Sequence, residues 1–339
     1  MRTIAALGIA AGLTLGTILP VWANDTSAEL ATGGLLFVPN ENVEMRAEDL
    51  FISAEKVRVQ YRFFNKSDTD VTVLVAFPLP EVRISEQDEN LSLPTDDPVN
   101  FFAFVTTVDG RPVATAVEQR VTAFGIDRTQ YLRDLGIPLA PQLAETNAAL
   151  DRLPADKWDE MLRLGMAEIE EYDVGQGMQK HLAARWGLAT TFYWQQTFPA
   201  GREIVIEHVY KPSVGASVQT DIGSPSSAKE PWFENYRRKY CLDNDFLGTV
   251  ERLRRANNSE FGPPYSEERI EYILKTGANW SGPIKDFRLV VDKGDAGSLV
   301  SFCGEGIKKI GPTQFEMRKS DFTPAGDLAV LILKKMPKE

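Results

Sequence analysis

Apolar and polar residues alternate with a period of two along much of the chain, the pattern of strands that bury one face. The strongest run spans residues 56–63, in which Val and aromatic side chains alternate with Lys, Arg and Gln. Short polar or Gly-containing turns separate neighbouring runs, which predicts hairpins. Three hairpins are expected, namely 56–63 with 71–77, 101–108 with 113–121, and 189–198 with 203–212.

Helical periodicity replaces this alternation in two regions. The first region, 126–187, is expected to be a helical insertion with segments at 128–135, 142–150, 155–171 and 178–186. In the second region helices are expected at 232–241, 245–255 and 267–275. The Gly, Ser and Pro content of residues 215–227 favours a linker before that second region.

These patterns together predict a mainly β, α+β protein, an antiparallel β-sandwich decorated by helices. We expect a single domain over residues 24–339, in which the last strands lie at 285–292, 299–303, 314–318 and 328–333. Its parts are a β-rich region at 24–125, the helical insertion at 126–187, a β-hairpin at 188–214, a helical region at 228–277 and a second β-rich region at 278–339.

The first 23 residues have the features of a secretory signal peptide. Arg2 is followed by an uncharged run rich in Ala, Leu and Gly, and the small residue Ala23 marks a cleavage site before Asn24. No other stretch of 18 uncharged apolar residues occurs, so no membrane-spanning segment is expected after processing. The sequence therefore predicts a periplasmic or secreted protein.

Charge and cysteine content narrow the classes of partner. The formal net charge is −11, and the clustered basic residues lie among acidic ones, which argues against a nucleic-acid partner. The two cysteines, Cys241 and Cys303, predict one disulfide in an exported chain. A loop of this size would stabilise the fold by about 4 kcal/mol on the chain-entropy model.

Candidate catalytic residues form no convergent set. The two histidines are His181, on an expected helix and facing solvent, and His208, in strand alternation and packed. Paired carboxylates of a glycosidase type would have to come from Glu168, Glu170 and Glu171 or from Glu203 and Glu207. Surface charge is the simpler interpretation of these acids, and no cofactor is predicted.

Two Asx-rich segments have the oxygen ligands that Ca²⁺ prefers. They are Asp243, Asn244 and Asp245, and the run Asp292, Lys293, Gly294 and Asp295. Neither matches a helix-loop-helix calcium site, and turns require the same residue types. With two His and two Cys at no ligand spacing, no metal site is predicted.

Aromatic residues concentrate between positions 186 and 198. Phe192, Trp194 and Phe198 would share one face of a strand, while Tyr193 takes the other. Core packing accounts for most of these rings, but Trp186, Tyr193 and Trp194 are candidates for ligand-facing aromatics that stack on a glycan or a partner protein.

Several phrases of the sequence resemble an uncharacterised family of exported bacterial proteins, domain of unknown function 4424. They are Asn24, Asp25 and Ser27 with Gly33–Leu35, then Met45, Glu48, Leu50 and Phe77–Pro80, and later Asn279, Trp280, Gly282–Ile284, Phe287, Leu289, Asp292–Gly294 and Ser301–Gly304. The resemblance covers nearly the whole chain after residue 23. It implies a periplasmic or secreted location in a Gram-negative bacterium and supplies no reaction.

The sequence thus favours a non-enzymatic binding or envelope-associated protein. One alternative is a secreted hydrolase that acts on cell-wall or polysaccharide substrates through paired carboxylates. Another is an assembly factor that binds an envelope protein through an exposed sheet edge.

Overall fold

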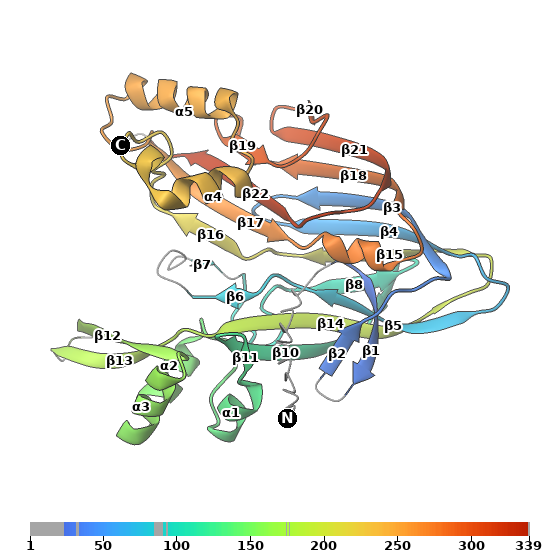
Figure 1. Ribbon diagram of the computed structural model, residues 1–339, viewed down its shortest axis with the longest axis horizontal. Coiled ribbons are helices and arrows are strands. Elements are labelled where there is room, and N and C mark those ends of the chain that lie inside the picture. Colours follow the sequence, from blue (N-terminus) through green and yellow to red (C-terminus); the bar gives the residue numbers. More distant parts are fainter. Residues whose placement is uncertain are drawn as a thin grey trace, which may run out of the picture.

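The computed structural model describes residues 24–31, 34–84, 91–92, 94–173, 175 and 177–337. The expected signal peptide, 1–23, lies outside these residues. In the described part the protein is β-rich with few helices, as the sequence predicts, and strands from both ends of the chain lie in the same sheets (Figure 1).

A seven-stranded sheet forms one layer, drawn in the lower half of Figure 1. Its strand order is β11-β10-β14-β5-β1-β2, and β6 also pairs with β14. The strands are β1 (Thr26–Ala31), β2 (Gly34–Phe37), β5 (Val71–Pro78), β6 (Val82–Arg83), β10 (Ala116–Ala123), β11 (Ile126–Asp127) and β14 (Gly187–Phe198).

An eight-stranded sheet, β20-β21-β18-β3-β4-β15-β8-β9, forms the opposing layer. β18 pairs with β3 in parallel, which joins the C-terminal strands to the N-terminal ones. The strands are β3 (Val43–Ile52), β4 (Val57–Asn65), β8 (Val105–Val108), β9 (Arg111–Val113), β15 (Glu203–Tyr210), β18 (Ile284–Asp292), β20 (Lys308–Lys309) and β21 (Gln314–Phe322).

A five-stranded sheet, β19-β22-β17-β16-β7, lies beside the eight-stranded one. Its strands are β7 (Leu91–Ser92), β16 (Val214–Ser217), β17 (Tyr265–Tyr272), β19 (Leu299–Phe302) and β22 (Leu328–Lys335). Both faces are buried: Ile270 and Ile332 join the main core, whereas Tyr265 and Leu333 pack under two helices. These helices are α4 (Pro231–Lys239) and α5 (Asn244–Ala256).

The remaining helices lie at the edge of the seven-stranded sheet (Figure 1). They are α1 (Thr129–Asp134), α2 (Ala144–Asp151) and α3 (Ala155–Arg163), and short 3-10 turns η1 (Ser227–Lys229) and η2 (Lys275–Asn279) occur later in the chain. Within the described ranges, no helix is long and apolar enough to cross a membrane.

Two of the three predicted hairpins, 56–63 with 71–77 and 189–198 with 203–212, are wrong for the same reason. In each, the two strands belong to opposing sheets and do not pair with each other. β4 pairs with β3 and β15, whereas β5 pairs with β1 and β14; likewise β14 and β15 lie in different layers. The third is correct only for β8 and β9, since β10 crosses to the other sheet. Buried Asn65 stabilises the corner where the chain passes from one sheet to the other. Its Nδ2 donates to the carbonyl oxygens of Thr69 and Phe198 at 2.8 Å each.

The helical insertion is half correct. The segments at 128–135 and 142–150 are helices, but α3 ends at Arg163, and residues 167–173 (β12, Ala167–Asp173) and 178–184 (β13, Met178–Ala184) form an antiparallel hairpin. Gly165, with φ +64°, stops α3 because a left-handed residue cannot continue it.

The C-terminal half needs two further corrections. Residues 267–272 of the expected helix at 267–275 belong to strand β17. Glu267, Arg269 and Glu271 lie on one face, while Ile270 and Tyr272 are buried on the other. The expected linker at 215–227 contributes β16 to the five-stranded sheet, so it is part of the fold.

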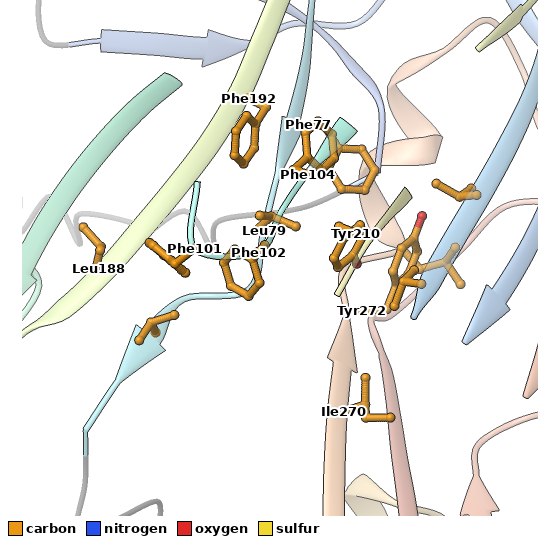
Figure 2. Close-up of a cluster of buried hydrophobic side chains, with 14 of the residues drawn as sticks. Phe77, Leu79, Phe101, Phe102, Phe104, Leu188, Phe192, Tyr210, Ile270 and Tyr272 are labelled. Atoms are coloured by element: carbon orange, nitrogen blue, oxygen red, sulfur yellow. The ribbon is translucent and has the colours of Figure 1, made fainter. Parts of the chain in front are cut away.

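The main core lies between the seven-stranded and eight-stranded sheets. Figure 2 shows Phe77, Phe104 and Phe192 close together, with Tyr210 and Tyr272 beyond them. The rings of Phe104 and Phe192 stack with centroids 4.3 Å apart, and the Phe104 ring also stacks on His208 at 5.1 Å. Aromatic side chains therefore form a continuous group within this core.

The predicted disulfide is present. Cys241 follows α4 and Cys303 follows β19, with their Cα atoms 5.1 Å apart. The bond ties the end of α4 to the edge of the five-stranded sheet.

Candidate functional site

A solvent-open cleft of about 770 Å³ lies between α4 and the five-stranded sheet. Its helical wall comes from α4, its floor from β16 and β17, and its third side from residues 80–83. A volume of this size falls within the range of small-molecule sites, about 300–1,000 Å³.

Three aromatic side chains at helical spacing form the wall. Trp232, Tyr236 and Tyr240 stand four residues apart, so they lie along one face of α4 and its C-terminal end. The ring centroids are 5.8 Å apart for the first pair and 4.6 Å for the second. Trp232 is 39% exposed at the mouth, whereas Tyr240 is buried at the base. Pro231 at the first helical position fixes the start of this helix.

Charged residues at strand spacing form the floor. Glu267, Arg269 and Glu271 alternate along β17, so all three point toward the cleft. Glu267 is buried and accepts hydrogen bonds from Thr220 Oγ1 at 2.6 Å, Tyr236 Oη at 2.6 Å and Arg269 Nη1 at 3.0 Å. Burial and the neighbouring Glu267 carboxylate raise the pKa of Tyr236, so its phenol remains a donor. The floor is therefore pre-organised by its own hydrogen bonds.

The outer part of the cleft keeps polar groups available to a ligand. Lys239 and Glu271 form an ion pair, and both side chains are about half exposed. The buried Ser217 hydroxyl on β16 has no hydrogen-bond partner among the described residues. A ligand in the cleft would meet an aromatic edge and an ion pair, with the unsatisfied Ser217 hydroxyl buried behind them.

A second polar feature is sealed inside the sandwich. Asp25, just before β1, reaches into the core, where its Oδ1 is 2.9 Å from His208 Nε2; Thr106 Oγ1 lies 2.9 Å from Nδ1 of the same ring. Asp25 and His208 are fully buried. Burial raises the pKa of Asp25, opposed by the charge of His208 and by its hydrogen bond.

Glu48 lies next to this group on the inner face of β3. Its Oε2 accepts a hydrogen bond from Asn24 Nδ2 at 3.1 Å, and Tyr61 donates to Asn24 Oδ1 and lies 3.1 Å from the Tyr272 hydroxyl. Burial raises the pKa of Glu48 to about 8. Among the described residues, Glu48 Oε1 and Asp25 Oδ2 lack any hydrogen-bond partner. We call Asn24, Asp25, Glu48, Tyr61, Tyr272, Thr106 and His208 the buried polar cluster.

The candidate ligand-facing aromatics do not line the cleft. Trp186 is fully buried and donates from Nε1 to the Leu139 carbonyl at 2.8 Å. Trp194 is 4% exposed and lies edge-on to His208 in the core. Tyr193 is half-buried on the other face of β14, as its alternation predicts, and packs near β1. Surface access is therefore absent for both tryptophans.

The other histidine and its neighbouring acids form a separate group on the β12–β13 hairpin. His181 lies on β13 rather than on a helix; its ring stacks on Tyr172 at 4.0 Å, and Nδ1 is 2.7 Å from Asp151 Oδ2. Glu168 and Glu170 both pair with Arg185, whereas Glu171 lies near Lys180. Each of these acids therefore has a basic neighbour.

The remaining acidic candidates have structural partners. Glu207 contacts Arg58 and Gln60 on the outer face of its sheet, and Glu203 lies 4.0 Å from Arg46 and Arg62. These ion pairs account for both glutamates. The residues considered for calcium binding are accounted for by local hydrogen bonds. Asp243 caps α5 by accepting from Phe246 N, while Asp292 and Asp295 accept from Gly294 N and Gly297 N in a turn. Within the described ranges no cluster of three or more His, Cys, Asp or Glu could hold a metal.

The chain belongs to the family described as a domain of unknown function (DUF4424), whose model matches residues 23–331. None of the curated proteins compared with it matches. One solved structure that resembles it is described as a "putative nutrient binding protein" from Legionella pneumophila; it is 16% identical, with 92% of this chain and 70% of that chain covered and a TM-score of 0.44. A likeness at this level carries no argument about the ligand.

Proposed function

We propose that this chain is an exported, non-enzymatic binding protein that holds a small hydroxylated molecule, such as a short saccharide, in the cleft beneath α4. The proposal depends on one observation: the partly exposed Trp232 ring lines the same cleft as the charged residues Glu267, Arg269 and Glu271 of β17. An aromatic ring can cover the apolar face of a sugar, and charged or amide groups can bond its hydroxyls. The signal-like residues 1–23 and the disulfide support export.

Binding fits the cleft better than hydrolysis does. Glu267 already accepts three hydrogen bonds, so its side chain is fixed in position. Glu271 lies four strand positions away, so the Cα atoms of the two residues are about 13 Å apart at 3.3 Å per residue, and their carboxyl groups are anchored far apart on the strand. Glycosidases hold their two carboxyl groups about 5–9.5 Å apart. This acid pair therefore supports recognition rather than paired-carboxylate chemistry.

The test is a calorimetric titration of the protein beginning at Asn24 with neutral, amino and acidic oligosaccharides of bacterial envelopes. We expect one of these classes to bind, and Trp232→Ala to weaken binding at least tenfold. Phe261→Ala is the matched control, because Phe261 is 64% exposed and is not among the cleft-lining side chains. Binding that is unaffected by Trp232→Ala, or the absence of binding across all classes, would reject the proposal.

The hydrolase alternative is measured on the same mixtures. Chromatography after prolonged incubation should recover each oligosaccharide intact. Release of shorter products, abolished by Glu271→Gln, would instead establish catalysis.

A further inference from the structure

The buried polar cluster contains more acid than base. Asp25 and Glu48 are both buried in it, and His208 is the one basic side chain that contacts it in the described structure. One oxygen of each carboxyl group has no hydrogen-bond partner there. An unpaired buried charge costs several kcal/mol, so these two acids can both be charged only if a second cation lies beside them.

Asn24 is anchored at the centre of this cluster. Thr276 Oγ1 donates to its carbonyl oxygen at 2.7 Å, and Trp280 Nε1 donates to the next carbonyl, that of Asp25, at 2.6 Å. A Cβ on Gly277 would come within 2.6 Å of Asn24 Nδ2, so the glycine makes room for this close approach. The segment is therefore fixed in place by residues 274–280.

The backbone nitrogen of Asn24 must lie close to the carboxyl groups. Four covalent bonds separate it from Nδ2 of the same residue, which places the two nitrogens within about 5 Å. Nδ2 itself donates to Glu48 Oε2 at 3.1 Å. Cleavage after Ala23 would convert this backbone nitrogen into an ammonium group.

We propose that the α-ammonium group of Asn24, created when the leader is removed, is the missing cation of the buried polar cluster and locks the sandwich after processing. The proposal rests on the export processing in the proposed function, but not on the ligand of the cleft. The ammonium group supplies donors to the unpartnered oxygens of Glu48 and Asp25 and balances the second carboxylate. Maturation would then be coupled to the stability of the fold.

Two forms of the chain, released from a cleavable fusion, test this idea. One begins at Asn24 and the other retains Ala23, which moves the amine by one residue. We expect the unfolding constant of the Asn24 form, from urea titration at pH 7, to be at least tenfold smaller. Equal stabilities of the two forms would overturn the proposal.

A charge-removing substitution shows whether Glu48 is the partner. Glu48→Gln should reduce the difference between the two forms to less than twofold, whereas Glu55→Gln, at an exposed position, should leave it at tenfold or more. A difference that survives Glu48→Gln would refute the pairing. Trp232→Ala should not alter the difference, so failure of the ligand proposal and failure of this one are distinguishable.

A measurement without substitutions covers the case in which Glu48→Gln does not fold. The amine of the native Asn24 form should resist an acetylating reagent at pH 7.5 and react in urea, as read by mass spectrometry of the N-terminal peptide. Rapid acetylation of the native protein would overturn the proposal, as would an exported protein whose first residue is not Asn24.

Discussion

Glu48 should make the stability of a chain that retains Ala23 dependent on pH. Where a peptide bond precedes Asn24, burial raises the pKa of Glu48 from 4.5 to about 8. Between these values the folded protein retains a proton that the unfolded chain releases. The contribution of Glu48 to the free energy of unfolding is therefore greatest below about pH 4.5 and decreases as the pH rises toward 8. With about 1.36 kcal/mol for each pH unit between these two pKa values, the total loss of stability is about 5 kcal/mol.

The assay is urea unfolding of the Ala23-retaining form at half-unit steps from pH 5 to pH 8. The free energy of unfolding should decrease by several kcal/mol across this range, and Glu48→Gln should remove most of the decrease. Asp25, whose pKa is also raised by burial, adds a decrease of the same sign that survives this substitution. His208, Tyr61 and Tyr272 face the same cluster, and the two phenols stay protonated because burial raises their pKa values.

The reasoning would be refuted if stability were constant from pH 5 to 8, or if Glu48→Gln preserved the full slope. The form that begins at Asn24 should show a smaller slope, since an adjacent ammonium group lowers the pKa of a carboxyl. A common slope in both forms would leave Glu48 buried but contradict its pairing with the amine.

Three further experiments test the stability of the fold. Replacing Cys241 and Cys303 by Ser opens a loop with a separation of 62 residues, and the free energy of unfolding should fall by about 4 kcal/mol in urea. Gly262→Ala would place a Cβ 1.9 Å from the Thr220 carbonyl oxygen and should lower the thermal midpoint, whereas Gly326→Ala has open space and should not. Gly248→Ala, inside α5, should raise the free energy of unfolding by about 0.5–1 kcal/mol.

The alternation of side chains predicted most strands but not their pairing. A period of two states that one face of β4 is buried, and it says nothing about which sheet the next strand joins. The turn at 65–68 is short enough for a hairpin, yet the chain arches into the opposing sheet because Asn65 satisfies carbonyl groups at the corner. The bond to Phe198 joins residues 133 positions apart, so no local pattern reveals it.

The cleft was only partly visible in the sequence. Trp232 and Tyr236 stand at i and i+4 of a correctly predicted helix, so an aromatic face could have been recognised there. The floor of the cleft could not be recognised in the same way. The charged run around Glu267 favours a helix by composition, whereas pairing with β16 and β22 makes it a strand. The sequence places its candidate ligand-facing rings at residues 186–194, where aromatic residues are most concentrated. In the structure this concentration belongs to the core, since Trp186 and Trp194 are buried.

A local irregularity of β3 turns the Glu48 side chain into the core. The β3–β4 register shifts between Met45 and Ala47, so an extra residue turns the inward series from Val43 and Met45 to Glu48 and Leu50. A bulge is a specific feature of a strand, and here it directs an acid into a core where an apolar side chain of similar volume would usually be as stable or more so. Packing alone does not explain that choice. A charged partner delivered to the same place does, and the chain would acquire one at Asn24 on removal of its leader.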